Sequence, residues 1–130
     1  MAVYVADTHA LVWYLGGSPL LGDAARQAFD EVASGDGLVI VPAISLAELV
    51  MMSEKGRSAI DAILITAAIR AAPGFELRPL IPEVALSIRA LTALPDIHDR
   101  LIVAEALANN ATLITRDQLI VASGLVPTLW

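Results

Sequence analysis

Short apolar runs alternate along this chain with longer stretches in which apolar residues recur every three or four positions. The short runs carry β-branched or aromatic side chains and predict strands at residues 3–6, 38–41, 75–77 and 112–115. Three of these runs are apolar enough to be buried on both faces, which is typical of a parallel sheet. The stretch 126–129 predicts an additional edge strand, where a proline is tolerated.

The longer stretches predict helices between these strands, over residues 19–34, 45–55, 58–72, 82–93 and 99–110. Glycines follow the first two, at positions 35 and 56, and Ser58 is a candidate cap for the third. The fourth begins with a proline, which the first helical position tolerates. Strands and helices that alternate in this way predict an α/β fold with a central, mainly parallel sheet flanked by helices.

Length and composition narrow the class of protein. The chain has 130 residues, of which 57% are hydrophobic and 17% charged, and it has no cysteine. A single domain over 1–130 is expected, because domains average roughly 150 residues. Disorder, a disulfide scaffold and a cysteine-based zinc site are excluded. The longest uncharged stretch, 8–22, is broken by glycine and proline and predicts no membrane span. The N-terminus lacks a secretory pattern, so a cytoplasmic location is expected.

The charge balance is acidic. Fourteen acidic and eight basic side chains leave a formal net charge of −6, and Lys55 is the only lysine. This balance argues against a protein that coats nucleic acid through its overall charge. It leaves room for a nucleic-acid contact made by a few local arginines, provided that the acids gather around a metal ion.

Four carboxylates stand where a site on a parallel sheet is expected. Asp7 and Asp117 follow predicted strands, and Glu48 lies in the first turn or two of the helix after the second strand. Asp99 opens the helix before the last buried strand. Ligands of open parallel sheets bind beyond the carboxyl ends of the strands. A cluster of carboxylates there needs a cation, and oxygen ligands without histidine or cysteine favour Mg²⁺ or Mn²⁺.

Each of these residues also has an ordinary structural interpretation. The three aspartates precede helical segments and are good N-caps, and Glu48 taken by itself is an ordinary solvated carboxylate. Arg100 and Arg116, which adjoin two of the acids, either contact phosphate or pair with nearby carboxylates. If the acids do bind a metal ion, hydrolysis of a phosphate ester is the favoured chemistry. The residues alone leave open a ribonuclease, a DNA nuclease or a phosphatase.

Four segments of the chain resemble the motifs of PIN-domain proteins, and more narrowly the VapC-type toxins of bacterial toxin–antitoxin pairs. They are VADTHALVWYL (5–15), SLAEL (45–49), HDRLIVAEA (98–106) and LITRD (113–117), in the family's order. The resemblance implies an endoribonuclease dependent on Mg²⁺ or Mn²⁺. Asp7 and Asp99 would bind the metal directly, Glu48 and Asp117 partly through water, and Thr115 would brace the site.

The resemblance also implies partners: an RNA substrate, a second copy in a homodimer, and a VapB-type antitoxin with a basic segment over the cleft. The chain departs from the family at Glu105, where a neutral residue is common, at the additional acid Asp96, and at Gly22, where a capping serine is common. The alternative interpretation is a non-catalytic PIN-like module that binds a protein partner and uses its acids only as helix caps.

Overall fold

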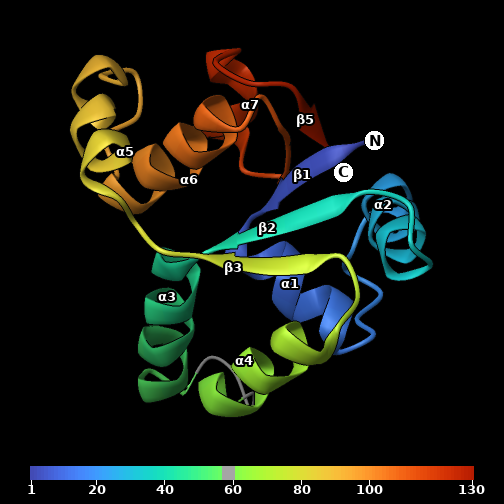
Figure 1. The fold of residues 1–130 in the computed structure, drawn as a ribbon. Helices are drawn as coiled ribbons and strands as arrows, with labels where there is room; N and C mark the ends of the chain where they lie inside the picture. Colours follow the sequence, from blue (N-terminus) through green and yellow to red (C-terminus); the bar gives the residue numbers. More distant parts are fainter. Residues whose placement is uncertain (57–60) are drawn as a thin grey trace.

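A parallel sheet forms the centre of the molecule. The computed structural model describes residues 1–56 and 61–130. In this part of the chain, five strands pair in the order β3-β2-β1-β4-β5, and every pair is parallel (Figure 1). The strands are β1 (Val3–Ala6), β2 (Leu38–Pro42), β3 (Phe75–Arg78), β4 (Thr112–Ile114) and β5 (Thr128–Leu129). The prediction of a mainly parallel sheet is confirmed, and the short last strand lies at the edge.

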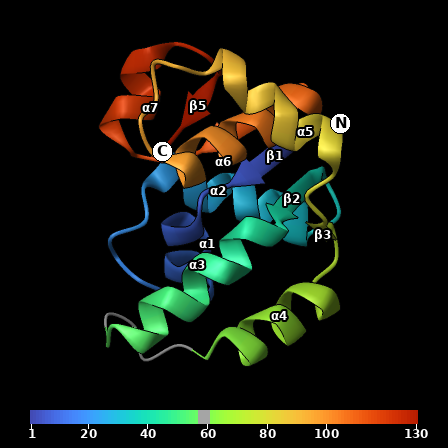
Figure 2. The same cartoon turned by 90° about the vertical axis from the view of Figure 1, so that its left-hand side faces the viewer.

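Helices cover both faces of the sheet. They are α1 (Thr8–Leu15), α2 (Asp23–Ala33), α3 (Ala43–Glu54), α4 (Ala62–Ala71), α5 (Pro82–Ser87), α6 (Ile97–Ala108) and α7 (Gln118–Ser123), with a 3₁₀ turn over Ile88–Ala90. Figure 2 shows α5, α6 and α7 on one side of the sheet and α3 and α4 on the other. None of the helices described has the length and apolarity that crossing a membrane requires.

Alternate side chains of the strands enter two separate cores. Val39 and Val41 of β2 belong to the core that packs on α1 to α4, whereas Ile40 between them belongs to the core beneath α5, α6 and α7. All three are fully buried. This period of two, with both faces apolar, is why these runs form central strands of a parallel sheet.

Several helix boundaries differ from the prediction. The helix predicted over 19–34 begins only at Asp23, because Gly22 has an extended backbone and Leu21 is buried from the preceding loop. The helix predicted over 82–93 passes into a 3₁₀ turn after Ser87. Leu91 and Leu94 then enter the core. Apolar spacing alone did not distinguish a helix from a loop that packs its leucines inward.

The remaining helices shift by smaller amounts. The helix predicted over 45–55 spans 43–54. The described helix in the 58–72 stretch begins at Ala62 with Asp61 as its cap, and the predicted cap Ser58 lies outside the described residues. The helix predicted over 99–110 spans 97–108, because Asp96 caps it. The prediction that Asp99 opens this helix is therefore wrong.

The strand order creates a crevice beside β1. The chain runs outward from β1 through β2 to β3, and then returns to the other side of β1 with β4 and β5. Connections that leave the sheet in opposite directions separate at such a point, so the crevice lies outside the carboxyl ends of β1 and β4. The segments that follow these two strands begin at Asp7 and Thr115.

Candidate active site

Asp7 and Thr115 join the ends of the two strands at the crevice. The Asp7 amide donates to the Ile114 carbonyl at 3.0 Å, and the Thr115 hydroxyl donates to Asp7 Oδ2 at 2.6 Å. Asp7 Oδ1 accepts from the His9 amide and so caps α1. Thr115 is buried, so its hydroxyl holds the Asp7 carboxylate in one orientation. One oxygen of Asp7 is thereby fixed by the first turn of α1 and the other by the segment that follows β4.

Asp117 follows on the same loop. Its amide donates to Thr115 Oγ1 at 3.1 Å, and its Oδ1 accepts from the amides of Leu119 and Ile120 at 3.0 Å each. These last two bonds cap α7. The predicted capping role is thus real for both Asp7 and Asp117. In both aspartates the capping bonds involve Oδ1 and leave Oδ2 outside the cap.

Glu48 reaches the crevice from α3. Its Oε1 accepts from the hydroxyl of Thr8, a buried residue at the start of α1, at 2.9 Å. Desolvation raises the pKa of Glu48, while the Thr8 hydrogen bond and nearby His98 lower it and the charges of Asp7 and Asp96 raise it again. Glu48 is therefore a half-buried carboxylate held toward other acids, and the ordinary solvated interpretation does not describe it.

Asp99 differs from Asp7 and Asp117 because it caps no helix. It lies in the first turn of α6, where Asp96 accepts the capping bonds from the amides of His98 and Asp99. Desolvation, followed by the charges of Asp117, Asp96, Asp7 and Glu48, raises the pKa of Asp99 from 3.8 to about 6. Four negative charges thus act on one half-buried carboxylate, and the interpretation of Asp99 as a cap is wrong.

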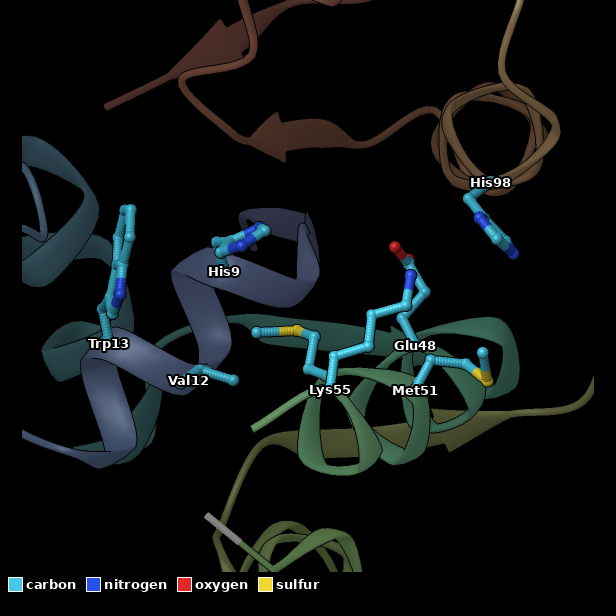
Figure 3. Close-up of a pocket in the computed structure, with 8 residues that line it drawn as sticks. His9, Val12, Trp13, Glu48, Met51, Lys55 and His98 are labelled. Carbon is cyan, nitrogen blue, oxygen red and sulfur yellow. The ribbon is translucent and has the colours of Figure 1, made fainter. Parts of the chain in front are cut away.

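Two adjoining cavities open around these acids and share His9 and Trp13 of α1. The first, of about 450 Å³, is lined by Glu48, Met51, Lys55 and His98 among others, and Figure 3 shows Glu48 rising from α3 between His9 and His98. The second, of about 480 Å³, is the tryptophan pocket, which is lined by Asp7, His9, Ala10, Trp13, Arg116, Asp117, Gln118 and Trp130. Asp7, Glu48 and Asp117 therefore border a recess formed by these two cavities, and Asp99 is not among the described residues that line either one.

The four carboxylates of the site have the chemistry that a divalent cation requires. In residues 1–56 and 61–130, no lysine or arginine forms an ion pair with Asp7, Glu48, Asp99 or Asp117. No three acidic or histidine side chains in these ranges are arranged closely enough to hold an ion between them. Mg²⁺ usually keeps several waters and takes only one or two protein carboxylates. The oxygen donors and the excess negative charge suit such a partly hydrated ion.

Comparison with known proteins identifies the family. The family model described as the PIN domain matches residues 4–121 of this chain. The chain belongs to the PIN-domain family. The matched residues include all four carboxylates at the crevice. No curated protein sequence matches the chain.

Solved structures share this PIN-domain fold at low sequence identity. VapBC2 from Rickettsia felis, solved with a DNA fragment from its promoter, aligns with a TM-score of 0.72 and 18% identity, covering 98% of this chain and 97% of that one. A toxin–antitoxin complex from Klebsiella pneumoniae aligns at 0.65 and 19%, covering 100% and 97%. FitAcB from Neisseria gonorrhoeae aligns at 0.63 and 17%, covering 98% and 96%.

The two arginines beside the PIN-domain acids lie in different surroundings. The Arg100 guanidinium donates to the backbone carbonyls of Leu94 and Ile88, so it braces the loop before α6. Arg116 is exposed, and its Cζ atom lies 4.4 Å from the centroid of the Trp13 ring. Neither arginine pairs with an acid in the described part of the chain. Of the two, only Arg116 lines the recess.

The two additional acids also differ from one another. Asp96 contributes to the raised pKa values of both Asp99 and Glu48, so it lies at the rim of the acidic group. Glu105 is buried further along α6, where its carboxylate accepts from Asn109 at 3.1 Å. Glu105 is not among the charges that act on Asp99 or Glu48, so it belongs to a separate polar cluster.

Two residues of this site were not predicted from the sequence: Thr8, which contacts Glu48, and Trp130, which lines the second cavity. Thr8 was passed over because its partner Glu48 lies forty positions away, and no local pattern links the two. Trp130 lies beyond the predicted edge strand and enters the recess only because β5 pairs with β4. The apolar character of Trp130 was visible in the sequence, but its position depends on sheet order.

Proposed function

We propose that this PIN domain, over residues 1–130, is an endoribonuclease dependent on Mg²⁺ or Mn²⁺ and the toxin of a toxin–antitoxin pair. The observation that carries the proposal is the burial of the Asp99 carboxylate among other negative charges. A carboxylate that caps no helix, is half-buried and faces four other acids is costly without a cation. Perturbed ionisable groups in a recess are typical of catalytic sites.

In this proposal, Asp7 and Asp99 bind the ion directly, and Glu48 and Asp117 hold it partly through water. A bound divalent ion lowers the pKa of a water ligand and neutralises charge on the phosphoryl group. The protein's own contribution is orientation, since Thr115 and Thr8 fix the carboxylates of Asp7 and Glu48 before substrate arrives. Hydrolysis of a phosphodiester bond in RNA is the reaction that such a site supports best.

The proposed partners are a VapB-type antitoxin, an RNA substrate and a second copy of the chain. The similarity to structures described as toxin–antitoxin complexes supports the first of these. The net charge of −6 and the acidic recess favour an inhibitor segment that carries a basic side chain. Such a segment would neutralise the acids without the metal ion.

The proposal is tested by incubating partner-free protein with a mixed pool of cellular RNA. We expect cleavage with Mn²⁺ and none with a chelator, since the acids repel phosphate unless a cation lies between them. No cleavage, together with no effect of Mn²⁺ on the melting temperature, would favour the non-catalytic protein-binding module instead. A pool of single-stranded DNA and a simple phosphate monoester, assayed in parallel, separate the ribonuclease from the other two ester-cleaving interpretations.

The Thr115 hydroxyl supplies a further prediction. Thr115→Val keeps the shape of the buried side chain but removes the donor to Asp7 and the acceptor for the Asp117 amide. We expect RNA cleavage to fall roughly 10–100-fold, as is typical when a partner that orients a metal ligand is lost. Thr115→Ser should restore most of the rate.

The matched control for this variant is Thr112→Val, which replaces a half-buried threonine at the start of β4, the strand that precedes Thr115. Rates are compared at saturating Mn²⁺, with melting temperatures to confirm the fold. Equal rates for Thr115→Val and Thr112→Val would contradict the positioning role.

A further inference from the structure

We propose that the tryptophan pocket binds a nucleobase of single-stranded RNA, from a nucleotide next to the scissile phosphate. The inference rests on the proposed endoribonuclease activity and adds the way in which its substrate is held. The pocket has a volume of about 480 Å³ and includes Asp7 and Asp117, so its occupant lies directly beside the acidic group.

Two indole rings form the walls of this pocket. Their centroids lie 5.7 Å apart and their planes meet at 73°, an edge-to-face arrangement. The His9 ring stands 5.5 Å from Trp13, and the Arg116 guanidinium lies 4.4 Å from the Trp13 centroid and 5.7 Å from that of Trp130. Both indoles pack against the core on one side and line the pocket on the other. Flat groups of this kind hold other flat groups by stacking.

Contacts from two distant parts of the sequence hold Trp130 in place. The Thr115 amide donates to the Leu129 carbonyl at 3.1 Å, which ties the end of β5 to the loop of Arg116 and Asp117. A Cβ atom at Gly22 would lie 2.5 Å from both the carbonyl carbon and Cδ1 of Trp130. The φ angle at Gly22 is an ordinary −64°. Glycine is required there because Trp130 fills the space, and the backbone conformation places no such demand.

The charge of the pocket favours a base over a phosphate group alone. Arg116 is the one cation that lines the described pocket, and two carboxylates stand beside it. With eight basic residues in all, the chain has few charges with which to neutralise an RNA backbone. Single-stranded RNA is commonly recognised by stacking its bases on aromatic rings or on guanidinium planes. Gln118 adds an amide donor and acceptor for the edge of a base.

Intrinsic fluorescence reports on this pocket directly, because Trp13 and Trp130 are the only tryptophans of the chain. The experiment uses the full chain with Asp99→Asn, which should bind RNA without cutting it, in excess Mg²⁺ so that the remaining acids do not simply repel the strand. A single-stranded ribonucleotide hexamer is compared with an abasic hexamer that carries the same number of phosphates. We expect the first to change the fluorescence and to bind at least about tenfold more tightly, in line with stacking of one base on an aromatic side chain.

Two variants in the Asp99→Asn background test the walls of the pocket. Gly22→Ala displaces Trp130 without replacing any residue that lines the pocket, and Trp13→Phe reduces the stacking surface. Gly22→Ala should bring hexamer binding close to that of the abasic strand, and Trp13→Phe should weaken it less, because a phenyl ring still stacks on a base. Leu86→Ala, which removes an exposed apolar side chain on α5, is the control and should change nothing. Melting temperatures confirm that each variant is folded.

The outcomes separate this inference from the proposed function. Equal binding of the two hexamers, or fluorescence that does not respond, overturns the base-binding pocket even if the wild-type chain cleaves RNA. Base-dependent binding without any cleavage by the wild-type chain in Mn²⁺ supports the pocket and overturns the nuclease. A fluorescence response to a protein partner but not to the hexamer assigns the pocket to that partner and overturns the inference.

Discussion

Replacing Asp99 by asparagine is expected to abolish RNA cleavage while making the metal-free protein more stable. Loss of cleavage follows if Asp99 is a direct ligand, because the ion contributes several kcal/mol of charge stabilisation in the transition state. Each 1.4 kcal/mol is a factor of ten in rate, so a fall of about 10³-fold or more is expected. Asp7→Asn should lose cleavage to a similar extent.

The gain in stability follows from the sign of the pKa shift. The pKa of Asp99 rises from 3.8 to about 6 on folding, because of burial and neighbouring acids. Between these values the folded chain holds a proton that the unfolded chain has lost, so this group favours folding as the pH falls. Above about pH 6 its charge opposes folding. Asparagine removes that cost, which we place at about 1 kcal/mol after discounting a shift of about two pKa units for solvent screening.

The measurement is thermal unfolding in chelator across the pH range from 4 to 8, together with the cleavage assay in Mn²⁺. A gain of about 1 kcal/mol corresponds to roughly 3–5 °C for a domain of this size. The control is Asp36→Asn, which neutralises an exposed acid just before the amino end of β2, whereas the site lies beyond the carboxyl ends of the strands. If Asp99→Asn destabilises the metal-free protein at neutral pH, the charge crowding at this position is not as described.

The second large effect is expected from the metal ion itself. Mn²⁺ at about 100 times its dissociation constant should stabilise the wild-type chain by about 2.7 kcal/mol, since it binds only the folded state. This amounts to a rise of roughly 10 °C in melting temperature. The rise should shrink as the pH falls through about 6, where Asp99 takes up a proton, because carboxylates bind metal in their deprotonated form.

Asp99 should therefore affect the stability of the metal-free protein and the stabilisation by Mn²⁺ in opposite directions as the pH changes. On acidification toward its pKa, the metal-free protein gains from this group while the contribution of Mn²⁺ declines. Asp99→Asn should lose most of the Mn²⁺ effect, and Asp36→Asn should retain it. A wild-type chain whose melting temperature does not respond to Mn²⁺ at neutral pH would contradict the proposed metal site.

The sequence predicted the sheet well because the evidence for it is local. The fully buried strands are continuous apolar runs, and their two-residue period needs no information from elsewhere in the chain. The ends of these strands are also visible in the local pattern. Asp7 and Asp117 could therefore be predicted to lie beyond the carboxyl ends of two parallel strands. Their role as helix caps could also be predicted from the sequence, because an N-cap is recognised by the helical residues that follow it.

Tertiary structure decided which carboxylates cap a helix and which face the other acids. Asp96 and Asp99 are both suitable caps by sequence. The loop that buries Leu94 and engages Arg100 brings Asp96 to the start of α6 and leaves Asp99 one turn in. Only then does Asp99 face the acids from β1, α3 and β4, and no local pattern encodes that approach.

The recess is also a product of tertiary structure, because residues far apart in the sequence form it. Thr115 bonds to a residue 108 positions away, and Trp130 depends on a glycine at the start of α2. Hydrophobic periodicity determines which side of an element is buried, but it carries no information about which distant element lies against it. Strand order and close packing decide that choice, because they alone bring together atoms that the chain separates.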